Sequence, residues 1–329
     1  MINRKAFTIL ATACVIFYCK RPPIDNNDSY VRSNQNTPTS SSLNGYTTCH
    51  TNPYQNSINT TFDTLIDKAN DWLDDGIVYA QISAEQDTKY INHDHSRFFP
   101  FQQVSTPCNE LSCIGGPCSD DDSKFACGMS HLDKLGNSDN DNGCIIYSIG
   151  GNNEWQFELD LLKRTKCHIH TFDCTGKKSR FKKTSDDRLT FHHICLGAHD
   201  MKGIGNDHPN CNYKTLCGDT WSFNRIQKEL QHKKIDLLKL DIEGWEWTIF
   251  DLEYTKRDMN LPMQLLMEVH YDYNGHGTRG VIHNNTMSSA MDIVRFQKHL
   301  LRMGYIVVHQ DDNPSCPHCT ELTLLRVAC

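Results

Sequence analysis

One segment, residues 235–250, constrains the fold of this chain more than any other: it reads IDLLKLDIEGWEWTIF. A short apolar run, interrupted by Lys239, ends abruptly in Asp241, Glu243 and Gly244. Such runs are typical of buried parallel strands, and in open α/β sheets ligands collect at the carboxyl ends of those strands. The two carboxylates therefore indicate either a functional site or a cap on the helix that follows, because acidic residues also stabilise helix N-termini.

Strands and helices alternate from residue 144 onward. Apolar runs predict strands at 144–149, 167–172, 189–196, 235–240 and 264–269, and helical spacing predicts helices at 155–164, 221–231 and 287–303. In the first of these helices we expect Trp155, Leu159 and Leu162 on one face. Strands at 305–309 and 321–327 follow, with no room for a helix between them.

This alternation predicts an α/β fold with a parallel sheet, and the short last link predicts an antiparallel hairpin at the edge. A Rossmann-like sheet that is mostly parallel and closed by a C-terminal antiparallel hairpin is the class I methyltransferase arrangement. Dinucleotide dehydrogenases of the Rossmann type normally lack the hairpin, which disfavours a nicotinamide oxidoreductase.

The N-terminal residues indicate the secretory pathway. An apolar run at 6–19 lies between basic flanks within residues 1–23, and its length is typical of a signal-peptide core. No small-residue cleavage site follows it, which favours an uncleaved signal-anchor over a removed signal peptide. The chain has 16 cysteines, and four of them (Cys108, Cys113, Cys118, Cys127) lack the close spacing of zinc knuckles. With sequons at 27, 59 and 284, they predict disulfides and a lumenal, Golgi-like or secreted body.

Composition divides the rest of the chain. Residues 24–60, rich in Asn, Ser, Thr and Pro, predict a disordered stem. Residues 61–143 predict one helix followed by an irregular, disulfide-rich lead-in, and residues 144–329 form the α/β domain. The net charge is −7 and no basic patch dominates, so nucleic acid is not an expected partner.

Two further strand ends carry ligand-binding signals. Gly150, Gly151 and Asn152 follow the first strand, where glycines let the backbone approach a ligand and the next helix offers free N–H groups. Asp173 follows the second strand, at the position where a carboxylate typically accepts hydrogen bonds from ribose. The pair indicates an adenosine-containing ligand, although a glycine turn and a surface acid can each be purely structural.

Several blocks now carry a family resemblance. IDLLKLDIEGWE, CIIYSIGGNNEWQFELDLL, HTFDCT and LLMEVH resemble the motifs of FkbM-like methyltransferases. With the lumenal leader, the set is similar to the metazoan group around methyltransferase-like protein 24. The resemblance covers residues 144–329. It implies S-adenosylmethionine as cofactor and O-methylation as chemistry.

The same resemblance implies positions for the cofactor. Gly150, Gly151 and Asn152 would face its methionine part, and Asp173 would hold the ribose. The end of the third strand, with Ala198, would border the adenine. The acids that close the fourth strand, Asp241 and Glu243, would sit beside the sulfonium and the acceptor.

Methyl transfer to a hydroxyl requires alignment and a proton acceptor. Asp241 and His270 would lie on neighbouring strands, with His270 as the base. Glu268 would either orient His270 or point to the other face of the sheet, and His270 could instead be a polar rim residue in a chain with 17 histidines. A divalent metal on Asp241, Glu243 and His270 is an alternative.

The hydroxyl-bearing acceptor, such as a glycan, would contact loops 202–217 and 271–285. A second interpretation is a catalytically silent methyltransferase-fold binding module. The C-x-x-C pair at 316–319 is interpreted as a structural disulfide or as two cysteines with separate partners, because a hairpin loop lacks the helix N-terminus that stabilises a reactive thiolate.

Overall fold

The structure is a computed structural model that describes residues 108, 110–118, 123–137, 143–181, 185–249, 260–270, 296–301, 303–312 and 319–326. The chain divides into two units, Met1–Asn44 and Gly45–Cys329, and every described residue lies in the second. The predicted anchor, stem, first helix, sequons and loop 271–285 lie outside the described residues. Within the described ranges, no helix is long and apolar enough to cross a membrane.

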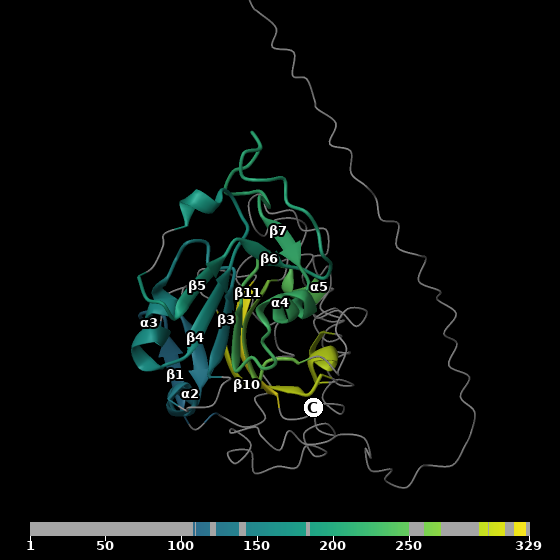
Figure 1. The fold of residues 1–329 in the computed structure, drawn as a ribbon. Coiled ribbons are helices and arrows are strands. Elements are labelled where there is room, and N and C mark those ends of the chain that lie inside the picture. Colours follow the sequence, from purple (N-terminus) through teal and green to yellow (C-terminus); the bar gives the residue numbers. More distant parts are fainter. Residues whose placement is uncertain are drawn as a thin grey trace, which may run out of the picture. The chain divides into compact units, whose positions relative to one another are not determined.

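A seven-stranded sheet forms the centre of the domain, in the order β10-β11-β9-β8-β3-β4-β5 (Figure 1). Five of its strands pair in parallel: β3 (Ile145–Ile149), β4 (His168–Phe172), β5 (Leu189–His192), β8 (Leu237–Leu240) and β9 (Gln264–His270). The strand β11 (Cys319–Arg326) runs antiparallel to both β9 and β10 (Tyr305–Asp312). The predicted mostly parallel sheet with a C-terminal antiparallel hairpin is therefore confirmed.

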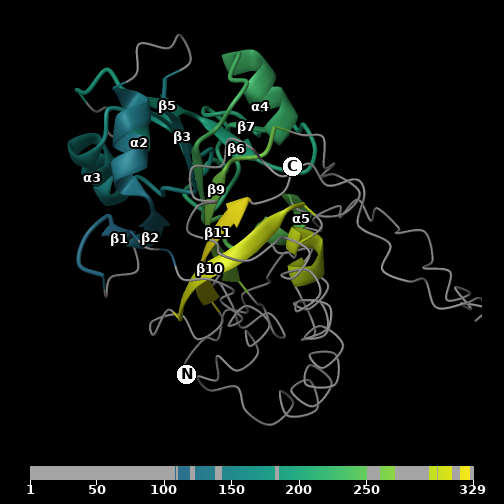
Figure 2. The same cartoon turned by 90° about the horizontal axis from the view of Figure 1, so that it is seen from below.

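Helices cover both faces of this sheet (Figure 2). On one face, α2 (Met129–Gly136) and α3 (Gln156–Arg164) contribute to an apolar core with the sheet residues Ile146 and Ile169. On the other face, α4 (Phe223–Leu230), α5 (Glu246–Ile249) and the helical residues 296–301 contribute to a second core with Tyr147 and Leu238. Burial on both faces explains why the strands read as continuous apolar runs.

The buried face of α3 differs from the prediction. Phe157, Leu161 and Leu162 are buried, whereas Leu159 is 44% exposed. Trp155 precedes the helix as its N-cap residue. Since successive helical residues are about 100° apart, the i, i+4 pair Phe157 and Leu161 sets the inner face. The predicted face was therefore wrong for Leu159.

The predicted third strand, 189–196, is two strands. Its first half is β5, while its second half, β6 (Ile194–Leu196), pairs in parallel with β7 (Asp219–Trp221) in a separate small sheet. The strand β7 was not predicted. Three residues are too few to show the alternating pattern of a strand, so the segment was not distinguished from the helix that follows. The disulfide Cys174–Cys195 joins β6 to the end of β4.

The lead-in is more ordered than its sequence indicated. It forms the hairpin of β1 (Leu111–Ile114) and β2 (Lys124–Cys127), followed by α2. Thr323 donates its hydroxyl to the Phe125 carbonyl at 2.6 Å, and the Gln264 side chain pairs with both backbone groups of Cys127. The hairpin is thus docked on the main sheet through β9 and β11.

Disulfides are confirmed in this region and in the domain. The described pairs are Cys108–Cys127, Cys113–Cys118, Cys144–Cys167, Cys174–Cys195 and Cys211–Cys217.

Candidate functional site

The predicted glycine turn lies where the ends of β3, β4 and β8 meet. Gly150 has φ +84°, and a Cβ there would overlap the carbonyl oxygen of Asp241, so only glycine fits. Asn152 and Asn153 also have positive φ, a conformation that asparagine tolerates well. The Asn152 N–H donates to Asp173 Oδ2 at 2.9 Å. The structure thus brings together the turn, Asp173 and the end of β8.

Asp173 is buried and organises the loop around it. Its Oδ1 accepts the N–H and the hydroxyl of Thr175 at 2.8 and 2.6 Å. The Arg180 guanidinium donates to the carbonyls of Asn152 and Thr175, both at 3.2 Å. Because each carboxylate oxygen can accept about two hydrogen bonds, Asp173 retains capacity for a ribose hydroxyl. Arg180 was missed by sequence reasoning, since it lies in a basic loop without a periodic pattern.

A small hollow adjoins Asp173. It is lined by Gly151, Asn153, Glu154, Trp155, Thr171, Asp173, Phe181 and Phe191, and its space of about 170 Å³ is partly open to solvent. Carboxylate, amide and aromatic groups suit a nucleoside, which combines hydroxyls with a flat ring. Small-molecule sites generally exceed about 300 Å³, so this hollow by itself does not hold a whole cofactor.

The predicted adenine-side segment follows β6. Gly197 donates its N–H to the Trp221 carbonyl at 3.0 Å, and the half-buried Ala198 comes next. Since Cys195 is disulfide-bonded to Cys174, this segment is tied to the residue that follows Asp173. The fit to an adenosine-containing cofactor thus rests on the turn, Asp173 and a tethered β6 end.

A buried ion cluster fills the adjoining strand ends of β8, β9 and β11. Lys124 Nζ, from the lead-in strand β2, lies 3.6 Å from Asp241 Oδ2 and 3.4 Å from Glu268 Oε2, and it also pairs with Glu321. Lys239 Nζ lies 3.3 Å from Asp241 Oδ2 and donates to the Gly150 carbonyl at 3.2 Å. Lys124 is only 1% exposed. Two lysines therefore hold the Asp241 carboxylate at the turn.

These contacts shift the ionisation of the cluster. Burial alone would raise the pKa of Asp241, but Lys239, Lys124 and His270 outweigh it and hold that pKa well below its usual range. Burial and the neighbouring Asp241 raise the pKa of Glu268 well above its usual value. Burial likewise raises the pKa of Glu321 to about 7, although Lys124 opposes the change. Asp241 is thus ionised, while Glu268 favours its protonated form.

The turn after Asp241 is held by an acid that the sequence did not single out. Glu243 has φ +58°, an uncommon conformation for a non-glycine residue. The buried Glu246 accepts the N–H of Ile242 and of Gly244, both at 2.9 Å, and contacts His270 Nδ1 at 3.2 Å. Glu246 therefore fixes both the turn and the imidazole.

His270 is enclosed by carboxylates. Its Nε2 lies 3.7 Å from Glu243 Oε2 and 3.9 Å from Glu268 Oε1. Burial would lower the pKa of His270, but Glu246, Glu268 and Asp241 raise it well above its usual value. His270 is thus at the predicted sheet edge, but it is held as an imidazolium, which is an acid rather than a ready base.

The residues whose geometry could hold a metal ion differ from the predicted set of Asp241, Glu243 and His270. Among the described residues, Glu268, His270 and Cys319 have ligand atoms within 4.8 Å of one another. Cys319, however, is disulfide-bonded, so its sulfur is not a thiolate ligand. The disulfide agrees with the structural interpretation of the C-x-x-C pair, and the partner of Cys319 lies outside the described residues.

Similarity to known proteins is consistent with this geometry. The family model described as "Methyltransferase domain" matches residues 55–326, more than half of the chain. The curated proteins "Probable methyltransferase-like protein 24" of Homo sapiens and of Rattus norvegicus are each 26% identical over 160 residues. These matches cover 48% of this chain and 39% of each relative, so the chain spans about two fifths of the curated relatives it matches.

Solved structures show weaker similarity. A chain described as "putative S-adenosylmethionine dependent methyltransferase from Listeria monocytogenes" is 9% identical, with 60% of this chain and 97% of that chain covered and a TM-score of 0.31. One described as "putative O-methyltransferase from Klebsiella pneumoniae" is 9% identical, with 77% and 99% covered and a TM-score of 0.32. The assignment rests instead on the family match and the strand order.

The predicted group is confirmed, whereas the narrower FkbM-like resemblance stays a prediction. The family model covers most of the described sheet, and that sheet has the class I methyltransferase arrangement, which binds S-adenosylmethionine. The chain belongs to the methyltransferase domain family.

Proposed function

We propose that this domain transfers a methyl group from S-adenosylmethionine to a hydroxyl oxygen of an acceptor in the secretory pathway, such as a glycan. One observation carries the proposal: the Gly150 turn, Asp173 and the ionised Asp241 meet at one edge of a class I sheet. Carboxylates with strongly shifted pKa values are concentrated at functional sites.

The chain's own groups suit both ends of the cofactor, which supplies a methyl group on a positively charged sulfonium. Asp173 keeps acceptor capacity for a ribose hydroxyl beyond its bonds to Asn152 and Thr175. Asp241 places a negative charge at the neighbouring strand end, where it stabilises a cation. The backbone of Gly150 and Gly151 permits close approach, as at other glycine turns that bind nucleotides.

The acceptor's proton needs a separate assignment. The raised pKa of His270 argues against our prediction that it is the base. We assign it instead to holding Glu243 and Glu246 in place. Asp241, with 21% of its side chain exposed, can accept the hydrogen bond of an acceptor hydroxyl and orient its oxygen. The proton that the hydroxyl loses on methylation would pass along this hydrogen bond to solvent. The buried Glu268 pairs with Lys124, the same lysine that holds Asp241.

The compartment is also part of the proposal. Five described disulfides support an oxidising environment, since such bonds rarely persist in the cytosol. We propose that residues 6–19 anchor a lumenal or secreted body, and that the acceptor meets the exposed loop 202–217.

The test is methyl transfer from labelled S-adenosylmethionine to fractionated lumenal glycans and proteins, with the mass shift of the product as readout. We expect transfer by the wild-type chain and by Asp187→Asn, which removes an exposed charge, and a loss of at least about tenfold with Asp241→Asn. Cofactor binding without transfer to any fraction would favour the catalytically silent binding module instead.

A further inference from the structure

Four histidines lie on one face of the sheet, away from the ion cluster. His168 and His170 are two residues apart in β4 and therefore point to the same face. His192 ends β5, and His232 follows α4. Tyr147, in the core on the α4 side, contacts both His170 and His232.

One of these imidazoles, His170, contacts two of the others. His170 Nδ1 and His192 Nε2 are 3.0 Å apart, in rings inclined by only 17°. The His232 ring centroid lies 4.5 Å from that of His170. The Tyr147 hydroxyl lies 2.8 Å from His232 Nδ1. All three rings are half-buried, so they can be reached from solvent.

We propose that His170, His192 and His232 bind a divalent transition-metal ion of the zinc class. Two nitrogens on one tetrahedral zinc ion, each about 2.0–2.1 Å from the metal, lie about 3.3 Å apart. The hydrogen-bonded pair is already within a few tenths of an ångström of that separation. Binding of an ion would release to solvent the proton that the two nitrogens share, and both rings would turn so that their lone pairs point at the ion.

The third proposed ligand, His232, is oriented by the Tyr147 hydroxyl. When His232 Nδ1 donates to the Tyr147 oxygen, its Nε2 keeps the lone pair that a metal needs, as metal-binding histidines commonly arrange. The three nitrogens are not yet within 4.8 Å of one another, so the His232 ring must turn to complete the site. Its backbone is fixed by the bond from the His232 N–H to the Gln227 carbonyl at the end of α4.

The ionisation of the cluster supports metal binding. Burial, followed by the neighbouring histidines, lowers the pKa of His170 to about 3. Burial, with His232 and Lys178, lowers that of His192 to about 4. The pKa of His232 is lowered in the same direction by burial and His168. The imidazoles are therefore neutral at neutral pH, which is the form that coordinates metals.

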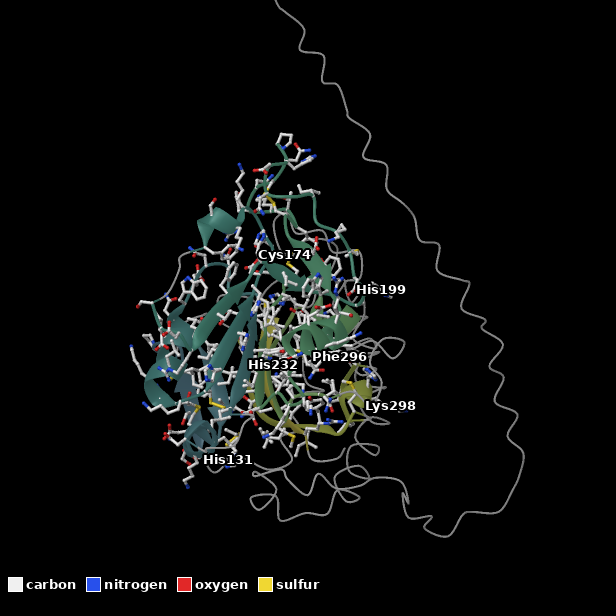
Figure 3. The ribbon with its side chains drawn as sticks, viewed as in Figure 1. His131, Cys174, His199, His232, Phe296 and Lys298 are labelled. Carbon is white, nitrogen blue, oxygen red and sulfur yellow. A yellow bond between two sulfur atoms is a disulfide. The ribbon has the colours of Figure 1, made fainter. Side chains whose placement is uncertain are left out.

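The experiment uses the full chain with its disulfides intact, freed of metal and titrated with Zn²⁺ by calorimetry, and with Co²⁺ by visible absorption. We expect saturable binding of one ion that His170→Asn and His192→Asn weaken by at least about tenfold. His131→Asn is the matched control: this half-buried histidine on α2 lies well apart from His232 in Figure 3, and we expect it to leave binding unchanged.

Two results would overturn the proposal. One is Zn²⁺ binding by His170→Asn and His192→Asn that equals binding by His131→Asn. The other is a wild-type chain whose Co²⁺ spectrum lacks the band of a tetrahedral site. The spectrum decides the question even when a variant fails to fold, as judged by circular dichroism. Neither readout depends on methyl transfer.

Discussion

Replacing Lys124 with methionine removes the cation that the lead-in places among three acids. Lys124 is 1% exposed and pairs with Asp241, Glu268 and Glu321. Removing one partner of a buried ion pair costs about 3–5 kcal/mol, because the remaining charge is left buried without compensation. We expect Lys124→Met to lower the free energy of unfolding by that amount near pH 8, where the acids are most ionised.

The size of this loss depends on pH, and the sign follows from Glu321. Its pKa is raised from 4.5 to about 7 on folding, so the stability linked to its protonation is present below pH 4.5 and is lost as pH rises through 7. In isolation that loss is on the order of 3 kcal/mol. Without Lys124 the pKa values of Glu268 and Glu321 rise further. The variant therefore differs less from wild type at about pH 5.5 than at about pH 8.

Urea denaturation of both proteins at the two pH values measures the difference. Lys202→Met is the control, since the Lys202 side chain is 85% exposed in its pair with Asp219 and such pairs contribute little. Adding Glu321→Gln to Lys124→Met should recover part of the stability. Equal losses for Lys124→Met and Lys202→Met, or a loss that does not change with pH, would refute the reasoning.

Three further changes probe the same architecture. Gly150→Ala should cost more than about 2 kcal/mol in urea denaturation, because its φ is positive and its Cβ overlaps backbone, whereas Gly151→Ala should cost less than about 1 kcal/mol. Replacing Cys174 and Cys195 together with serine should lower the free energy of unfolding by about 3 kcal/mol, because the unfolded chain is no longer closed into a loop by a disulfide between residues 21 positions apart. An unchanged stability in a thermal melt would contradict this. His270→Gln should destabilise the fold more at about pH 6 than at about pH 9, because the raised His270 pKa contributes stability below 6.5 that is lost as pH rises through the folded value.

The sheet could be predicted because its strands are apolar on both faces. The runs that became β3, β4, β8 and β9 end within two residues of their predicted bounds, and the acids and glycines that follow them lie at the predicted edge of the sheet. The placement of Gly150, Asp173 and Asp241 at one edge could accordingly be predicted from sequence, while their roles remain predictions. Parallel pairing alone brings such strand ends together, whatever the packing of their side chains.

The residues that sequence missed reach the site from elsewhere in the chain. Lys124 lies in a four-residue strand of the lead-in, and Glu321 lies on β11. Neither position shows a spacing relative to Asp241, because their proximity follows from how β2 and β11 dock. The surroundings of His270 were missed for a related reason: the sequence gives its place on β9, but not the Glu246 carboxylate beside it.

Titration calorimetry of the full chain with S-adenosylmethionine tests most directly whether this sheet edge is a cofactor site. We predict saturable binding to the wild-type chain and to Asp187→Asn. For Asp173→Asn, which keeps one acceptor oxygen for the loop but removes the charge, we predict affinity weakened by at least about tenfold. Absence of saturable binding to the wild-type chain, or equal affinity for Asp173→Asn, would contradict the assignment of this edge as the cofactor site.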